Sequence, residues 1–180
     1  RRLTAHAIAD GARAGHLISA LGVFEQGYYD QVGYGTGSYA SFFTFDPSTL
    51  QVDVRPRPPR RISSEQWEAI HVSRLSRMRG HGGCNITPAV FTRAGIHDVR
   101  NGFGLGYFDE GGQITHHLWA GARDIEHGPY FVAWLAFENR AQFLELMALV
   151  RGLGDQVEQV KMLEPAGIQL QDLVRQPLRQ

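Results

Sequence analysis

The sequence predicts a mixed α/β or α+β fold, in which helices flank a mixed sheet. Segments 102–109, 113–120 and 129–137 are rich in aromatic and β-branched residues, which is the composition of strands. The last of these has apolar residues on both faces, so we expect it at the centre of the sheet. The clearest helical pattern, at 141–153, comes next, and another strand pattern follows at 157–163. Helices that follow and separate strands in this way predict a layered domain with one buried sheet.

The first part of the chain has weaker patterns. Apolar residues at helical spacing predict a helix over residues 2–14. The apolar run 17–21 has the length of a short strand, and residues 28–32 can form one helical turn that Gly33 would end. Residues 38–46 combine several aromatic side chains and read as a strand that is buried on both faces.

A proline-rich and arginine-rich segment, RPRPPRR at 55–61, is the best candidate for a domain boundary. Three prolines in seven residues forbid regular strand pairing and stiffen the chain. We therefore expect one domain at 1–54 and a second at 62–180. The basic side chains between them are open to two interpretations, a solvated linker or an anion-binding cluster.

The second domain should begin with a helix at 64–78, which Ser63 or Ser64 can cap. A glycine-rich loop, GHGGCNITP at 80–88, comes next, ahead of the strands. A short helix is expected near 169–175.

Composition excludes several classes of protein. Lys+Arg and Asp+Glu number 18 each, so the chain lacks the basic excess that a general nucleic-acid surface needs. Hydrophobic residues make up 43%, which is enough to build a core, yet no apolar run approaches the ~20 residues of a membrane span. Cys84 is the only cysteine, which rules out an internal disulfide framework and makes the reducing cytoplasm the expected compartment.

Histidine and cysteine give little support for a metal or nucleophilic site. His116 and His117 are neighbours on a predicted strand, so their side chains point to opposite faces and cannot easily share one ion. His71 lies on the apolar face of its helix and is expected to be a core histidine. Cys84 has no base nearby in sequence. Its glycine-rich loop could hold a phosphate through backbone N–H groups, although it matches no phosphate-loop motif and a tight connector is the simpler interpretation.

One motif is more specific. Residues 29–34 read Tyr-Asp-Gln-Val-Gly-Tyr and fit the pattern Y-x-x-x-G-[FY] without a gap. A helix, an apolar strand, a loop and this tyrosine turn, in that order, resemble the second half of a GNAT (Gcn5-related) N-acetyltransferase domain. The longer stretch ISALGVFEQGYYDQVGYG is similar to Eis-type (enhanced intracellular survival) acetyltransferases, and residues 102–180 resemble the second, degenerate GNAT domain of that family.

The resemblance implies an enzyme that transfers acetyl from acetyl-CoA to a primary amine of a small molecule, such as an aminoglycoside. It assigns Tyr29 as the general acid that protonates the departing thiolate, and it places Phe24 and Glu25 against the coenzyme. Arg1 would lie beside the pyrophosphate at the N-terminus of the first helix. No metal, nucleic acid or membrane is implied, and the family suggests a homo-oligomer, either a trimer or a hexamer. The alternative is a non-catalytic scaffold, oligomerisation or small-molecule-binding module of the same fold.

The sequence departs from the family in three places. The family's pyrophosphate loop, the three strands before it and a C-terminal domain like a sterol carrier protein have no counterpart in these 180 residues. In the family, the carboxylate at the end of that last domain is the expected general base. We therefore expect the sequence to be a fragment that does not acetylate by itself.

Overall fold

The chain divides into two compact units, Arg1–Tyr39 and Ala40–Gln180. The computed structural model describes residues 2–22, 27–37, 41–77, 87–126 and 128–175. Each unit is described below by itself. Among the described residues, no helix combines the length and the apolar composition that crossing a membrane would require.

The first unit contains one helix and one tight turn. Helix α1 spans Arg2–Arg13, which confirms the helix predicted from apolar spacing. The expected turn is also present, as the 3-10 helix Asp30–Val32, and Gly33 ends it with φ 90° in the left-handed region that favours glycine. The strand predicted at 17–21 is wrong: this run is irregular, with Leu17 98% and Ile18 75% exposed. An apolar run becomes a strand only where a neighbouring strand pairs with it, and no strand is assigned in the part of this unit that the structure describes.

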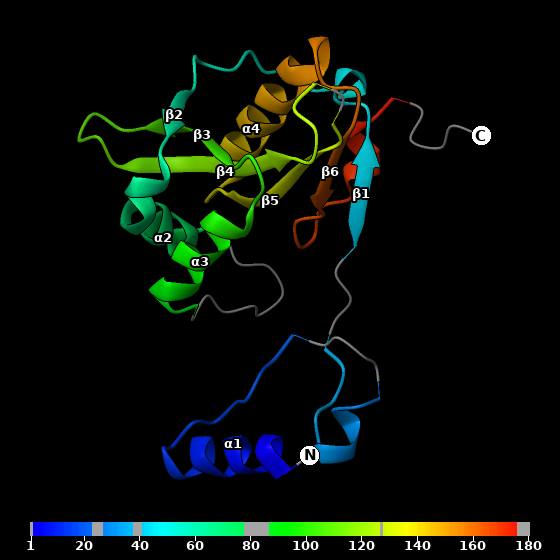
Figure 1. Cartoon of the computed structure of the whole chain (residues 1–180). Coiled ribbons are helices and arrows are strands. Elements are labelled where there is room, and N and C mark those ends of the chain that lie inside the picture. The colour runs from blue at the N-terminus through cyan, green and yellow to red at the C-terminus, as the bar shows by residue number, and fades with distance from the viewer. Residues whose placement is uncertain (1, 23–26, 38–40, 78–86, 127, 176–180) are drawn as a thin grey trace. The chain divides into compact units, whose positions relative to one another are not determined.

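The second unit is built on a six-stranded mixed sheet (Figure 1). The strands are β1 (Phe42–Phe45), β2 (Arg60–Ile62), β3 (Phe103–Phe108), β4 (Ile114–Ala122), β5 (Tyr130–Ala136) and β6 (Val160–Leu163). Their order is β1-β6-β5-β4-β3-β2, and only the β5–β6 pair is parallel. The strands predicted at 38–46, 102–109, 113–120, 129–137 and 157–163 are present as β1, β3, β4, β5 and β6, whereas β2 was not predicted. The burial expected on both faces of the first is wrong, because β1 is an edge strand and Phe42 is 54% exposed. Strand β5 lies between β4 and β6, the central place expected from its two apolar faces.

Three helices flank this sheet. They are α2 (Trp67–Ser76), α3 (Ala89–Asp98) and α4 (Arg140–Gly152). Ser63 caps the 3-10 turn Ser64–Gln66 that leads into α2, in a reciprocal capping box with Gln66. Helix α4 confirms the strongest helical prediction, and the helix expected near 169–175 is a 3-10 turn at Leu170–Leu173. Helix α3 was not predicted.

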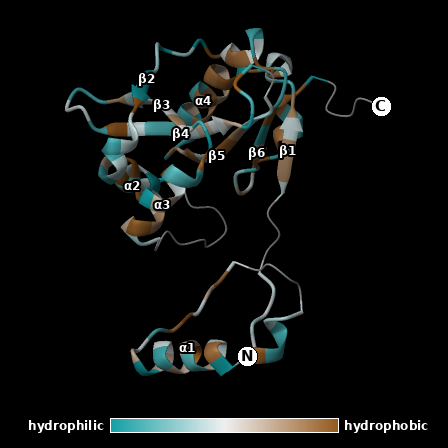
Figure 2. Ribbon diagram, viewed as in Figure 1, coloured by the Kyte–Doolittle hydropathy of each residue, from teal (hydrophilic) through white to brown (hydrophobic). Residues whose placement is uncertain are grey.

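The two faces of the sheet carry separate hydrophobic clusters. The larger cluster gathers α4 with side chains of β1, β4, β5 and β6, including Leu118, Val132 and Leu146, and Figure 2 colours parts of these elements brown. The smaller cluster contains Ile70 of α2 and Ile96 of α3, packed with Trp119 of β4. Helix α4 therefore covers one face of the sheet, and α2 with α3 covers part of the other.

The chain divides between Tyr39 and Ala40, and not at the proline-rich segment where the sequence suggested a boundary. Strand β1 pairs along its length with β6, and Leu50 and Val52 are buried in the larger core cluster. Arg151 of α4 also donates a hydrogen bond to the carbonyl of Val52. Residues 42–54, which the sequence analysis grouped with the first domain, thus belong by their contacts to the second unit. Segment 55–61 runs inside that unit and leads into β2.

Candidate functional site

The tyrosine turn of the first unit holds the residue that the sequence analysis singled out most sharply. Tyr29 precedes the 3-10 helix, and its carbonyl accepts hydrogen bonds from the backbone N–H groups of Val32 at 3.0 Å and Tyr34 at 3.3 Å. Its half-buried ring lies edge-on to Tyr28, at 5.1 Å between centroids, and to Tyr34, at 6.0 Å. The Tyr34 hydroxyl lies 2.6 Å from Oγ of Ser19. The ring of Tyr29 is thus packed between two other tyrosines of the same turn.

The other predicted site residues cannot be placed beside Tyr29. Arg1, Phe24 and Glu25 lie outside the described residues. The same holds for Cys84 and most of its glycine-rich loop. The structure therefore describes the predicted proton donor and the helix that follows Arg1, and no more of the expected site.

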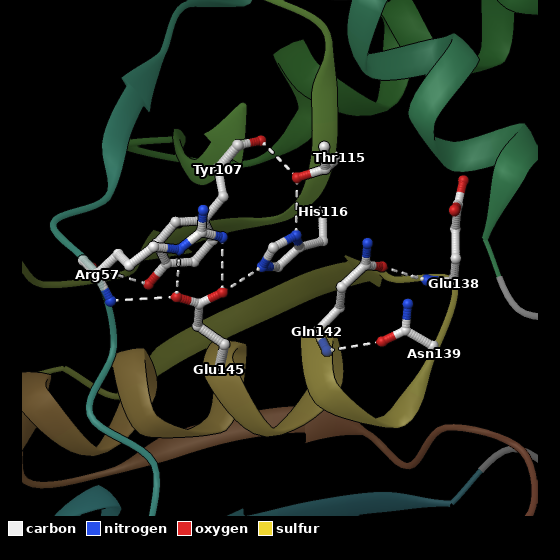
Figure 3. Close-up of polar contacts among 8 residues, drawn as sticks. All are labelled: Arg57, Tyr107, Thr115, His116, Glu138, Asn139, Gln142 and Glu145. Carbon is white, nitrogen blue, oxygen red and sulfur yellow. Dashed lines mark hydrogen bonds and ion pairs between the residues drawn. The ribbon is translucent and has the colours of Figure 1, made fainter. Parts of the chain in front are cut away.

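The second unit contains a polar cluster that the sequence analysis did not predict (Figure 3). The guanidinium of Arg57 donates two hydrogen bonds to the carboxylate of Glu145, from Nε at 2.8 Å and from Nη2 at 2.9 Å, and the Arg57 backbone N–H adds a third at 3.1 Å. His116 Nε2 lies 3.0 Å from Oε2 of the same carboxylate, the oxygen that also accepts one of the guanidinium hydrogen bonds. Its Nδ1 lies 2.9 Å from the Thr115 hydroxyl, and the ring of Tyr107 stacks on it at 4.6 Å.

The charges in this cluster are set mainly by the Arg57–Glu145 pair. Hydrogen bonds from Arg57 lower the pKa of Glu145 to about 2, so the carboxylate stays ionised. Burial lowers the pKa of His116. The hydrogen bond and the charge of Glu145 act to raise it, but burial is the larger effect, and we assign His116 as neutral. Neutral His116 donates from Nε2 to Glu145. The Thr115 hydroxyl, which lies beside Nδ1, donates its one hydrogen to the carbonyl of Tyr107 at 3.1 Å. Burial also raises the pKa of Tyr107 to about 12, which keeps its phenol protonated.

This cluster holds Arg57 in place and so stabilises the fold. Tyr107 donates its hydroxyl hydrogen to the carbonyl of Arg57 at 3.2 Å, so both the side chain and the backbone of Arg57 are held. The anion that binds this arginine of the proline-rich segment is therefore the protein's own Glu145. No sequence signal could have found this pair, because 88 residues separate its members.

The opposite face of the sheet carries a second network, around His117. This side chain is fully buried, with Nδ1 3.0 Å from the hydroxyl of Ser73, and its Nε2 accepts a hydrogen bond from the indole of Trp134 at 3.2 Å. Burial, and the nearby charge of Arg74, lower the pKa of His117 to about 3. His71 is half-buried, with Nδ1 2.9 Å from the Thr92 hydroxyl. His116 and His117 thus point to opposite faces, as their adjacent positions on a strand predicted.

Within the part of the chain that the structure describes, no three His, Cys, Asp or Glu side chains are grouped so that they could hold a metal ion.

Comparison with known proteins places this architecture among solved structures. No family model matches the sequence, and no curated protein matches it either. A probable N-acyltransferase of Enterococcus faecalis V583 superposes on 97% of this chain with a TM-score of 0.78 at 18% identity. A GCN5-related N-acetyltransferase of Anabaena variabilis gives 0.73 over 96% at 12% identity, and Eis1 of Mycobacterium abscessus gives 0.70 over 98% at 16% identity.

These three proteins are longer than the chain. The chain covers 45%, 45% and 47% of them, respectively, and so spans a little under half the length of the structures it matches. At such low identity, the likeness concerns the fold. The chain has the fold of the part it matches in these structures, which include a GCN5-related N-acetyltransferase and Eis1.

Proposed function

We propose that this chain belongs to an enzyme that transfers the acetyl group of acetyl-CoA to a primary amine of a small molecule, such as an aminoglycoside. The observation that carries the proposal is the tyrosine turn. It presents a phenol immediately before a short helical turn that ends at Gly33, in a chain with the GNAT fold. The acceptor class comes from the resemblance of the sequence to Eis-type acetyltransferases.

The described part of helix α1 is compatible with a phosphate-bearing coenzyme. The first described turn of the helix carries no acidic side chain, so no carboxylate there would repel a bound phosphate. We assign Arg1 to the pyrophosphate, and Phe24 and Glu25 to other contacts with the coenzyme. No metal ion has a role in the proposed reaction.

In this proposal, Tyr29 is the general acid. Acetyl-CoA supplies a thioester, in which a C–S bond breaks as the N–C bond to the amine forms. The Tyr29 hydroxyl donates its proton to the departing sulfur, which would otherwise leave as a thiolate. The amine nitrogen gives up one proton, and Tyr29 regains one from solvent, so the enzyme returns to its starting state. The contacts of Tyr29 with Tyr28 and Tyr34 hold the ring in one orientation for this transfer.

A second candidate role applies to residues 40–180. The Arg57, Glu145 and His116 side chains of this unit bind one another, which is what a scaffold requires of its polar core. We propose as the alternative function a non-catalytic scaffold or oligomerisation module, within a homo-oligomer that the family resemblance suggests to be a trimer or hexamer.

A thermal-shift titration of the full-length protein with acetyl-CoA tests the proposal. A ligand that binds only the native state raises the unfolding midpoint as its concentration increases. A rising midpoint, together with thiol release in the presence of a primary amine, supports the enzyme. An unchanged midpoint would overturn it in favour of the scaffold.

A further inference from the structure

One end of the six-stranded sheet is uncovered on the face away from α4. The cluster that α2 and α3 form on that face contains side chains of β2, β3, β4 and β5, but none of the described residues of β1 or β6. Three large apolar side chains of β1, β5 and β6 are exposed: Phe42, Phe131 and Leu163. Their strand neighbours Phe43, Val132 and Met162 pack in or against the larger cluster beneath α4, so the three exposed side chains point to the opposite face. We call this surface the β1 patch.

Strand β1 also has an unpaired edge. It is the last strand at this end of the sheet, and β6 is its one neighbour among the described strands (Figure 1). The backbone N–H of Glu164 donates to the carbonyl of Ser41 at 2.9 Å, which marks Ser41 as a position that bonds to β6. Such positions alternate in an antiparallel pair, so Phe43 also bonds to β6, whereas the N–H and C=O groups of Phe42 and Thr44 point away from it. Four backbone groups therefore face outward along this edge.

The other edge of the sheet is protected against pairing with another chain. Strand β2 has three residues, follows Pro58 and Pro59, and carries the exposed side chains of Arg60 and Arg61. Prolines and charged side chains are common means of keeping an edge strand from pairing with another molecule. Strand β1 has neither, since its sequence is Phe-Phe-Thr-Phe. Only the β1 edge therefore lacks this protection.

We propose that β1 pairs antiparallel with β1 of a second copy of this chain, so that the two sheets become continuous across a two-fold axis. An interface between two identical edges closes as a dimer, whereas one between two different edges extends into an open filament, and the prolines and arginines at β2 oppose the second arrangement. With the axis normal to the sheet, the β1 patches of both copies lie on one face, side by side, and can bury part of their apolar surface.

The charges near the edge are compatible with this dimer. Strand β1 is uncharged, so no like charges meet across the new strand pair. Lys161 lies on β6, one strand in from the edge, with its ammonium 5.1 Å from the centre of the Phe42 ring. The two copies of Lys161 would be three strand spacings apart, about 14 Å, a distance at which salt screens most of their repulsion. The dimer does not depend on the acetyl transfer proposed above, and either proposal can fail without the other.

Sedimentation equilibrium of the full chain over a range of concentrations tests the association. We expect a monomer–dimer equilibrium with a dissociation constant of about 1–100 μM, because the paired strands are short. A chain that stays monomeric up to about 500 μM would overturn the proposal.

Thr44→Pro is the informative variant, because it removes an outward N–H donor and leaves the hydrogen bonds between β1 and β6 in place. Two donors are lost per dimer, so the dissociation constant should rise at least about tenfold. The matched control is Thr44→Val, which keeps the N–H group and the branched side chain and should change the constant by less than about threefold.

Circular dichroism and the unfolding midpoint, measured at a concentration where the chain is monomeric, show whether Thr44→Pro folds. If it does not, Thr44→Lys places a charge on the edge strand and should weaken the dimer in the same way. A dissociation constant that equals that of the wild type, in whichever of these two variants folds, would place the association elsewhere on the molecule and overturn the proposal.

Discussion

The guanidinium of Arg57 donates two hydrogen bonds, of 2.8 and 2.9 Å, to the carboxylate of Glu145, although 88 residues separate them along the chain. The pair joins the extended segment before β2 to the middle of helix α4 (Figure 3). His116, on the sheet beneath, lies against the same carboxylate. One acidic side chain therefore connects three parts of the second unit, and its ionisation should affect stability.

We predict that Glu145→Gln lowers the free energy of unfolding at neutral pH by about 1–3 kcal/mol. The pKa of Glu145 falls from 4.5 to about 2 in the folded protein, which would correspond to a larger effect if the pair were fully shielded. Arg57 is 59% exposed and Glu145 only 13%, so solvent screens part of the interaction. Chemical denaturation at pH 7 measures the difference.

The effect of Glu145→Gln on the free energy of unfolding should depend on pH in a defined direction. Because folding depresses the pKa of Glu145, its contribution is complete above about pH 4.5 and disappears as the pH falls towards 2. The difference between the wild type and Glu145→Gln should shrink over that interval. Exposed Glu138 provides the matched control, since Glu138→Gln should change stability by no more than about 0.5 kcal/mol. A difference for Glu145→Gln that stays constant from pH 5 to about pH 2 would contradict the assignment.

Gly121 in β4 is the position where an added methyl group should be most costly. A Cβ there would come within 2.4 Å of the Arg100 carbonyl oxygen and 2.5 Å of a Val99 methyl carbon. Gly121→Ala should therefore destabilise the fold by about 1–3 kcal/mol, through a forced shift of the backbone. Gly152, at the end of α4, has nothing within 4 Å of the corresponding position. Gly152→Ala should be neutral or stabilise by up to about 1 kcal/mol, so equal unfolding midpoints for the two variants would contradict the packing.

The difference between predicted and observed elements has physical causes. Strand β5 could be placed at the centre of the sheet because both of its faces are apolar. A strand that is buried on two sides needs apolar residues at consecutive positions, and this pattern is visible in the sequence. Helix α3 was missed because its apolar pattern is misleading: Val90 and Phe91 are exposed, while the buried residues are Thr92 and Ile96. Gly95 in its interior weakens the helical signal further.

The polar contacts were harder to predict from the sequence than the helices and strands. The opposite orientations of His116 and His117 follow from strand geometry and were predictable from their adjacent positions. Their partners were not, since Glu145 and Trp134 reach them only through the folding of distant segments. Arg57 illustrates the point best: the sequence left a solvated linker and an anion-binding cluster open, and only the structure shows that Glu145 is its partner.

The last prediction concerns the proposed general acid. Tyr29→Phe in the full-length protein should lower kcat for acetyl transfer at least about tenfold and leave acetyl-CoA binding nearly unchanged, because only the donated proton is lost. The ring contacts with Tyr28 and Tyr34 survive the substitution, so stability should change little. Tyr34→Phe is the matched control: it removes a hydroxyl 2.6 Å from Ser19 Oγ, in the same cluster, and should keep most of the activity. Steady-state rates with a saturating amine, together with thermal-shift titration by acetyl-CoA, separate the two variants. Similar kcat values for wild-type and Tyr29→Phe protein would show that another group protonates the leaving thiolate.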